Sequence, residues 1–144
     1  MARILLVIAN KYTNQSYLIE LVQSNLLEND CIIWSNTPVC EGLLQTKAKV
    51  IGPGIGKSFE ETKRTKSTGL TRTLSYPFLV LKVLHKMLLT PITCAWRLNF
   101  TRFRVKDSHF DVIMAADAQA VLSVWAYGKK HSHPQLLSVK KVIS

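Results

Sequence analysis

The sequence contains little of what marks several specialised classes of protein. It has only 6 glycines and 5 prolines among 144 residues, which excludes a collagen-like repeat and a Pro/Gly-rich linker. Acidic residues are scarce too: 9 Asp and Glu face 19 Lys and Arg, so the net charge is +10. Because 47% of the residues are hydrophobic, the chain can still bury the core of one domain. The charge favours an anionic partner such as nucleic acid, anionic lipid or a phosphorylated substrate.

Motifs for covalent and metal chemistry are also missing. The three cysteines, Cys31, Cys40 and Cys94, are an odd number without CxxC spacing, which argues against a disulfide framework and a zinc site. Neither GxSxG nor HExxH occurs, and the four histidines form no ligand set. The apolar run at 4–9 is too short for a signal peptide. We therefore expect reduced cysteines, a cytoplasmic protein, and no metal or resident cofactor.

Most of the positive charge lies in the middle third of the chain. Residues 57–106 contain 11 Lys and Arg but only two acidic residues, Glu60 and Glu61, for a local net charge of +9. The flanking stretches are nearly neutral, which is typical of an ordinary scaffold. We expect the middle third to meet the anionic partner.

Short apolar runs without alternation predict strands that are buried on both faces, as in a parallel sheet. They lie at 3–9, 31–34, 48–51, 110–115 and 135–139. Between them we predict a helix that Ser16 caps and that begins at Tyr17, a short helix at 39–45, and a helix that Asp117 caps and Gly128 ends. This alternation of strands and helices predicts a single α/β domain over 1–144, Rossmann-like and doubly wound, with a mainly parallel sheet of about five strands. The region 57–106 would be a basic, amphipathic helical insertion.

An apolar stretch in this insertion predicts a surface helix. It runs from Phe78 to Leu89 and is ended by Pro91, so at about 20 Å it is too short to span a membrane. Long aliphatic residues dominate it, whereas nucleic-acid bases stack on aromatic rings, so an anionic membrane is a better partner than nucleic acid. The alternative is an ordinary core helix with one charged face. The basic side chains expected to contact phosphate groups of lipid or carrier are Lys82, Lys86, Arg97, Arg102 and Arg104.

A glycine-rich string follows the third predicted strand and suggests an alternative function. It ends in Gly56-Lys57-Ser58, the last residues of a phosphate-binding P-loop. The pattern GxxxxGK[ST] requires its first glycine at position 51, which is Ile51, so the loop is one residue too short. The alternative is thus a nucleotide site at Gly54, Gly56, Lys57 and Ser58, or a plain glycine-rich turn.

The two ends of the chain together resemble a known family. The first strand reads RILLVIAN, and a late strand reads FDVIMAAD from Phe110 to Asp117, before a helix, a Gly-Lys-Lys turn and Pro134. This pattern resembles the N-terminal domain of GT-B glycosyltransferases of the retaining family-four type, over about residues 1–55 and 107–140. The family often has F-D-[VI]-[IV]-H-x-H-D at this strand. Met114 and Ala116 stand where those two histidines would be.

The resemblance implies an acceptor-binding, membrane-associated N-terminal half of a sugar transferase. The donor, a nucleotide sugar, would bind a second Rossmann-like domain that a partner subunit supplies or that has been lost. The acceptor, a lipid-linked one in this interpretation, would lie over the C-terminal edge of the sheet. Asp117 would act in catalysis by orienting the acceptor hydroxyl, although capping a helix is its simpler role. A non-enzymatic basic adaptor at an anionic membrane is the remaining alternative. The side chains expected to bind substrate at the exit of the first strand are Asn10, Lys11, Asn14 and Gln15.

Overall fold

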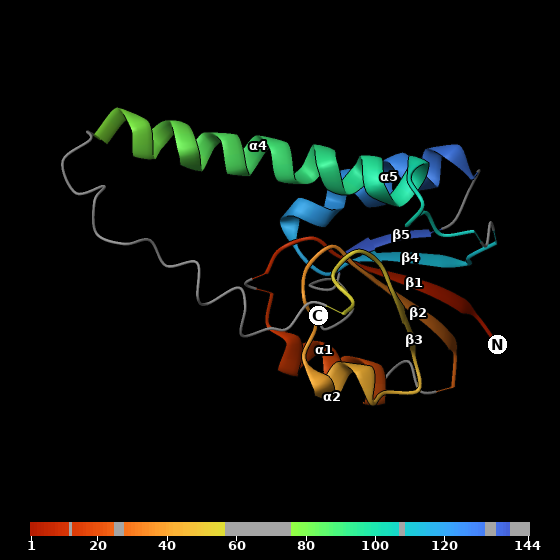
Figure 1. The fold of residues 1–144 in the computed structure, drawn as a ribbon. Coiled ribbons are helices and arrows are strands. Elements are labelled where there is room, and N and C mark those ends of the chain that lie inside the picture. The colour runs from red at the N-terminus through yellow and green to blue at the C-terminus, as the bar shows by residue number, and fades with distance from the viewer. Residues whose placement is uncertain (12, 25–27, 57–75, 107–108, 132–134, 139–144) are drawn as a thin grey trace.

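The computed structural model describes the chain except residues 12, 25–27, 57–75, 107–108, 132–134 and 139–144. Its centre is an all-parallel sheet in the order β3-β2-β1-β4, and β5 pairs in parallel with the outer edge of β4 (Figure 1). This confirms the α/β class and the Rossmann-like arrangement. The strands are β1 (Arg3–Ile8), β2 (Asp30–Ser35), β3 (Lys49–Ile51), β4 (Val112–Ala115) and β5 (Gln135–Ser138).

Strand β1 is central because apolar residues cover both of its faces. Leu5 and Val7 belong to one hydrophobic cluster, and Leu6 and Ile8 belong to the other. Successive side chains of a strand point to opposite sides, so a continuous apolar run serves two cores at once. The run of residues in β1 thus requires helices on both faces of the sheet.

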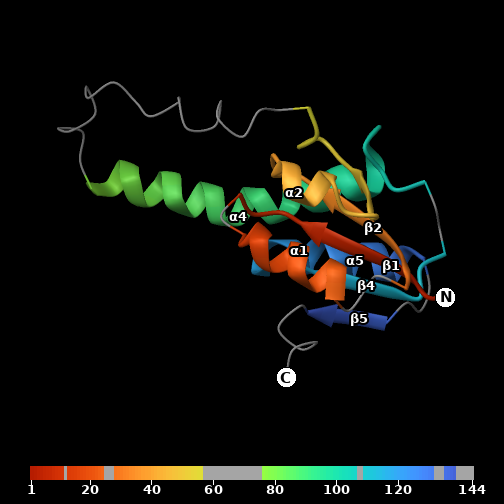
Figure 2. The ribbon, with the colours of Figure 1, turned by 90° about the horizontal axis from the view of Figure 1, so that it is seen from below.

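Helices cover the two faces of the sheet in pairs (Figures 1 and 2). On one side lie α1 and α2, and on the other lie α4 and α5, which follows the 3₁₀ turn η1. The helix bounds are α1 (Gln15–Ser24), α2 (Glu41–Leu44), α4 (Tyr76–Phe100), η1 (Ala118–Ala120) and α5 (Val121–Lys130).

Two predicted helix ends are wrong. Helix α1 begins at Gln15, and the Asn14 side chain accepts the bond from the Tyr17 N–H (3.3 Å), so Asn14 and not Ser16 provides the cap. Gly128 lies buried inside α5, which ends at Lys130. In contrast, Asp117 is confirmed as a cap, because its carboxylate accepts the Ala120 N–H at 2.9 Å.

The predicted end of the surface helix at Pro91 is also wrong. Helix α4 continues through Pro91 to Phe100, so it is about 37 Å long. Proline removes one backbone hydrogen bond, and beyond it Cys94 and Leu98 are completely buried in the core on this side of the sheet. The burial of this final segment offsets the lost bond. By length and composition, 77–100 is apolar enough to cross a membrane, so shortness no longer argues against spanning.

The two halves of α4 have different environments. Every residue from 77 to 89 is exposed, and this half extends beyond the sheet (Figure 1). The other half is attached to the domain: Arg97 donates to the Asn36 side chain (2.9 Å) and Lys130 donates to the Asn99 carbonyl (3.1 Å). The exposed half spans about 20 Å, less than the roughly 30 Å of a hydrocarbon core. While the C-terminal half of α4 stays packed on the sheet, the exposed half is shorter than a hydrocarbon core.

The glycine-rich turn after β3 packs tightly against the loop after β2. At Gly52, φ is +127°, and an added Cβ would lie 2.3 Å from the Ser35 carbonyl oxygen. At Gly54 an added Cβ would lie 1.9 Å from the Thr37 carbonyl oxygen, and the Gly54 N–H already donates to Ser35 (3.1 Å). Close packing thus explains both glycines. Lys57 and Ser58, the other half of the P-loop alternative, lie outside the described residues.

This packing predicts a selective loss of stability. Gly54→Ala should lower the free energy of unfolding by about 2–3 kcal/mol, because the new methyl group overlaps a backbone carbonyl. Gly56→Ala is the matched control: its φ is +84° with nothing within 4 Å of an added Cβ, so it should cost about 1 kcal/mol. Urea unfolding followed by tryptophan fluorescence measures both. Equal losses would contradict the packing explanation.

Candidate functional site

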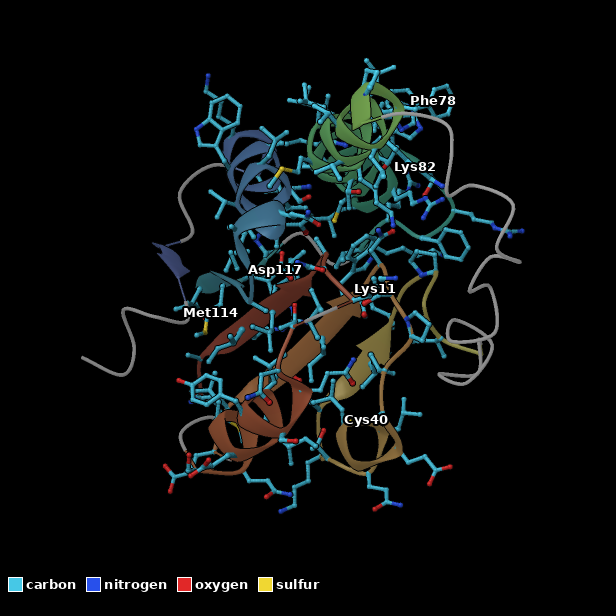
Figure 3. The ribbon with its side chains drawn as sticks, turned by 90° about the vertical axis from the view of Figure 1, so that its left-hand side faces the viewer. Lys11, Cys40, Phe78, Lys82, Met114 and Asp117 are labelled. Carbon is cyan, nitrogen blue, oxygen red and sulfur yellow. The ribbon has the colours of Figure 1, made fainter. Side chains whose placement is uncertain are left out.

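A cavity of about 310 Å³ lies at the C-terminal ends of the strands, beneath α4; we call it the sheet-edge pocket. It lies where the chain order of the strands reverses, because β1 is followed by β2 on one side and has β4 on the other. Open α/β sheets bind ligands in the crevice at this switch point. Figure 3 views this edge of the sheet and shows Lys11 and Asp117 on it, with α4 and its Lys82 and Phe78 above. The resemblance places the acceptor at this edge, and acceptor binding there stays a prediction.

The floor of the sheet-edge pocket is polar. Asn10 and Lys11 come from the loop after β1, Asn36 and Thr37 from the loop after β2, and Gln119 from η1. Side-chain amides can donate and accept hydrogen bonds, as recognition of hydroxyl groups requires. No described residue that lines the pocket carries a carboxylate. The floor is therefore suited to a hydroxylated or anionic ligand.

Helix α4 provides the wall of the sheet-edge pocket. Val83 and Met87 are apolar, Thr90 is polar, and Lys86 brings a second positive charge beside that of Lys11. Helical spacing places 83, 86, 87 and 90 on one side of α4, and this side faces the sheet edge. A ligand in the pocket would thus touch the same helix that exposes apolar residues to the surroundings.

Asp117 organises the loops that form the floor. One carboxylate oxygen accepts hydrogen bonds from the Ala9 N–H (3.0 Å), the Asn10 N–H (2.9 Å) and the Thr13 hydroxyl (2.9 Å). The other oxygen accepts the bond from Ala120 in η1. These bonds join the exit of β1 to the exit of β4. The carboxylate has four donors and does not line the pocket, so its geometry is that of a positioning residue, and its catalytic role stays a prediction.

The structure separates the four side chains expected to bind substrate. Asn10 and Lys11 line the sheet-edge pocket, whereas Asn14 caps α1. Gln15 is buried: its amide nitrogen donates to the Pro38 carbonyl (3.0 Å) and its oxygen accepts the Cys40 N–H (2.6 Å). The amide of Gln15 thus holds α1 against the loop after β2.

The five basic side chains expected at phosphate groups are separated in a similar way. Lys86 lines the sheet-edge pocket, and Lys82 lies exposed on the projecting half of α4 (Figure 3). Arg97 binds Asn36, while Arg102 and Arg104 line another cavity beside β3. The alternative nucleotide site comprised Gly54, Gly56, Lys57 and Ser58. The first two lie in the turn after β3, and the other two lie outside the described residues.

The sequence did not predict three of the five polar floor residues, nor three of the four wall residues. Asn36 and Thr37 follow β2 as Asn10 and Lys11 follow β1, so the same rule about strand exits would have found them. Gln119 lies two residues after Asp117 at the exit of β4. The α4 residues could not be found in this way, since their contribution depends on where the helix lies over the sheet.

The thiols have no catalytic environment. Burial raises the pKa of Cys31 and of Cys94 to about 11, so both are protonated at neutral pH. Cys40 is partly buried, and its N–H is bonded to Gln15. The described residues contain no group of three or more His, Cys, Asp or Glu that could hold a metal ion.

The family resemblance rests mainly on β1 and on the segment from Phe110 to Asp117, which contains β4, and these two strands lie on either side of the switch point. Met114 is buried in the core on the α1 side, so it places no base near the pocket. The chain matches no protein-family model, and comparison with curated proteins and with solved structures finds no match.

The four bonds to Asp117 predict a large effect of its removal. Asp117→Ala should lower the free energy of unfolding by about 3 kcal/mol, because it leaves several partly buried donors without an acceptor. Asp117→Asn should cost less, since it keeps one acceptor oxygen. Asp111→Ala is the control: Asp111 is exposed and accepts the Arg3 N–H, so its loss should be below about 1.5 kcal/mol. Chemical unfolding compares the three, and similar costs for Asp117→Ala and Asp111→Ala would contradict the organising role.

Proposed function

We propose that this chain is the acceptor-binding, membrane-associated N-terminal half of a GT-B-type glycosyltransferase. The sheet-edge pocket carries the proposal: a cavity with a polar floor at the switch point of a parallel sheet, walled by a helix with an exposed apolar surface. The resemblance of β1 and β4 to family-four transferases supports it. The donor half, which binds the nucleotide sugar, would come from elsewhere.

The floor side chains would bind the acceptor. The amides of Asn10, Asn36 and Gln119 would recognise sugar hydroxyl groups, which both donate and accept hydrogen bonds. Lys11 and Lys86 would neutralise a phosphate group of a lipid-linked acceptor. Asp117 would act by holding Asn10 in place through the backbone, and not by contact with the acceptor.

The projecting half of α4 would lie in the interface of an anionic membrane. Phe78, Leu81 and Leu88 are 70%, 71% and 59% exposed, which a soluble monomer rarely shows on one helix. Lys82 lies among these apolar residues and would remain at the level of the lipid headgroups, whereas Lys86 faces the sheet-edge pocket. The attached half of α4 would keep the sheet-edge pocket beside the membrane.

Vesicle binding tests the membrane contact. Lys82→Glu should weaken binding to vesicles with anionic lipid about 30-fold, since each lysine near the surface contributes about 1 kcal/mol and the reversal counts twice. Lys47→Glu changes the net charge equally but lies exposed just after α2, so it should have little effect. Co-sedimentation with vesicles measures both. Equal weakening would show attraction by net charge alone, without a specific role for α4.

A pull-down from native membranes tests the transferase. A second Rossmann-like subunit with a nucleotide-sugar site should co-purify, and the pair should transfer sugar to a lipid-linked acceptor in detergent. Lys86→Ala should then lower kcat/KM for the acceptor about tenfold or more, because one charge-assisted contact is lost. Lys47→Ala is the control outside the pocket. Membrane binding without any transfer by the pair would contradict the proposal and favour the adaptor.

A further inference from the structure

A second cavity, of about 400 Å³, lies between the edge strand β3 and the residues that follow α4; we call it the β3-edge cavity. Four basic residues line it: Lys49 from β3, and Arg102, Arg104 and Lys106 from the segment after α4. No described residue that lines this cavity is acidic. It shares no lining residue with the sheet-edge pocket, so it is a separate site.

The fold brings these basic residues together from two distant parts of the chain. The register pairs Ile32 with Lys49, so both point to the α4 side of the sheet. The segment after α4 is held there because the Trp34 indole donates to the Phe103 carbonyl (2.8 Å) and Val105 is buried in the same core. The positions of Arg102 and Arg104 on either side of Phe103 therefore follow from core packing.

The β3-edge cavity is positively charged above an apolar base. Ile32, Ile51 and Val105 line it together with the four cations. Arg102 lies over the Phe103 ring, 4.8 Å from its centre, which leaves the edge of its guanidinium group available for hydrogen bonds. Like charges around one cavity repel each other, and a multiply charged anion would relieve that repulsion.

We propose that the β3-edge cavity binds a phosphate group, either of a small soluble ligand or of a lipid headgroup. Two guanidinium and two ammonium groups suit a tetrahedral anion with several oxygens better than a single carboxylate, because arginine binds phosphate with paired hydrogen bonds. This site does not depend on sugar transfer. Its cations belong to β3 and the segment after α4, whereas acceptor binding is assigned to the sheet-edge pocket.

The test uses the full chain with pyrophosphate as the soluble probe. Titration followed by backbone amide NMR should give saturable shifts concentrated at 49–52 and 102–106. Arg102→Gln with Arg104→Gln should raise the Kd at least about tenfold, because two charge-assisted contacts are lost. Lys47→Gln with Lys129→Gln removes the same charge outside the cavity and should leave the Kd nearly unchanged. If the double arginine variant is unstable, Lys49→Gln in β3 replaces it, and this variant should also raise the Kd for pyrophosphate.

A second arm distinguishes the source of the phosphate. Vesicles of neutral lipid with and without phosphatidic acid are tested with the same variants. If pyrophosphate binds saturably and the double arginine variant binds vesicles as well as the unchanged chain does, the ligand is soluble. If the double arginine variant loses binding to vesicles with phosphatidic acid and the double lysine control does not, the ligand is a lipid headgroup. If neither probe distinguishes the arginine pair from the control, the proposal is overturned.

Discussion

The carboxylate of Asp117 is the contact on which the candidate site depends. A parallel sheet places the exits of β1 and β4 side by side, but it does not determine the paths of the loops that follow. Asp117 joins them, because one oxygen accepts the N–H groups of Ala9 and Asn10 and the other accepts the Ala120 N–H in the turn after β4. A hydrogen bond to a carboxylate is roughly twice as strong as one between neutral groups. The same carboxylate thus holds the two loops of the floor together.

Helix α4 has two roles that usually belong to different helices: one half packs in the core, and the other half is exposed. Its C-terminal half contributes Cys94 and Leu98 to the core and so behaves as an ordinary layer of the α/β fold. All the described side chains of its N-terminal half are exposed, and this half extends beyond the strands, as Figure 1 shows. Pro91 stands close to the change between the two halves. Because the helix is continuous there, the exposed apolar surface has a fixed direction relative to the pocket.

The sequence predicts the sheet well because the relevant signals are local. The apolar runs of β1 and β4 and the capping position of Asp117 can all be recognised within a few residues. Local signals failed where packing competes with propensity: Pro91 and Gly128 usually end helices, yet both lie inside one, and Asn14 caps α1 in place of Ser16. The strand exits predicted only Asn10 and Lys11 of the pocket's lining residues. The contribution of Val83, Met87 and Thr90 depends on the position of α4 in space, which no local pattern contains.

The distribution of charge connects the two cavities with α4. Nearly all the excess positive charge lies in residues 57–106, and the fold puts the described part of that segment on one side of the sheet. Lys86 faces the sheet-edge pocket, and Arg102 and Arg104 face the β3-edge cavity, while Lys82 lies on the projecting half between apolar residues. In the proposed function, an acceptor with its polar group in the sheet-edge pocket would have its lipid chain beside α4. Phosphate binding at β3 would then bring a second contact with anions to the same side of the domain, so orientation at a membrane and recognition of the acceptor would depend on the same face.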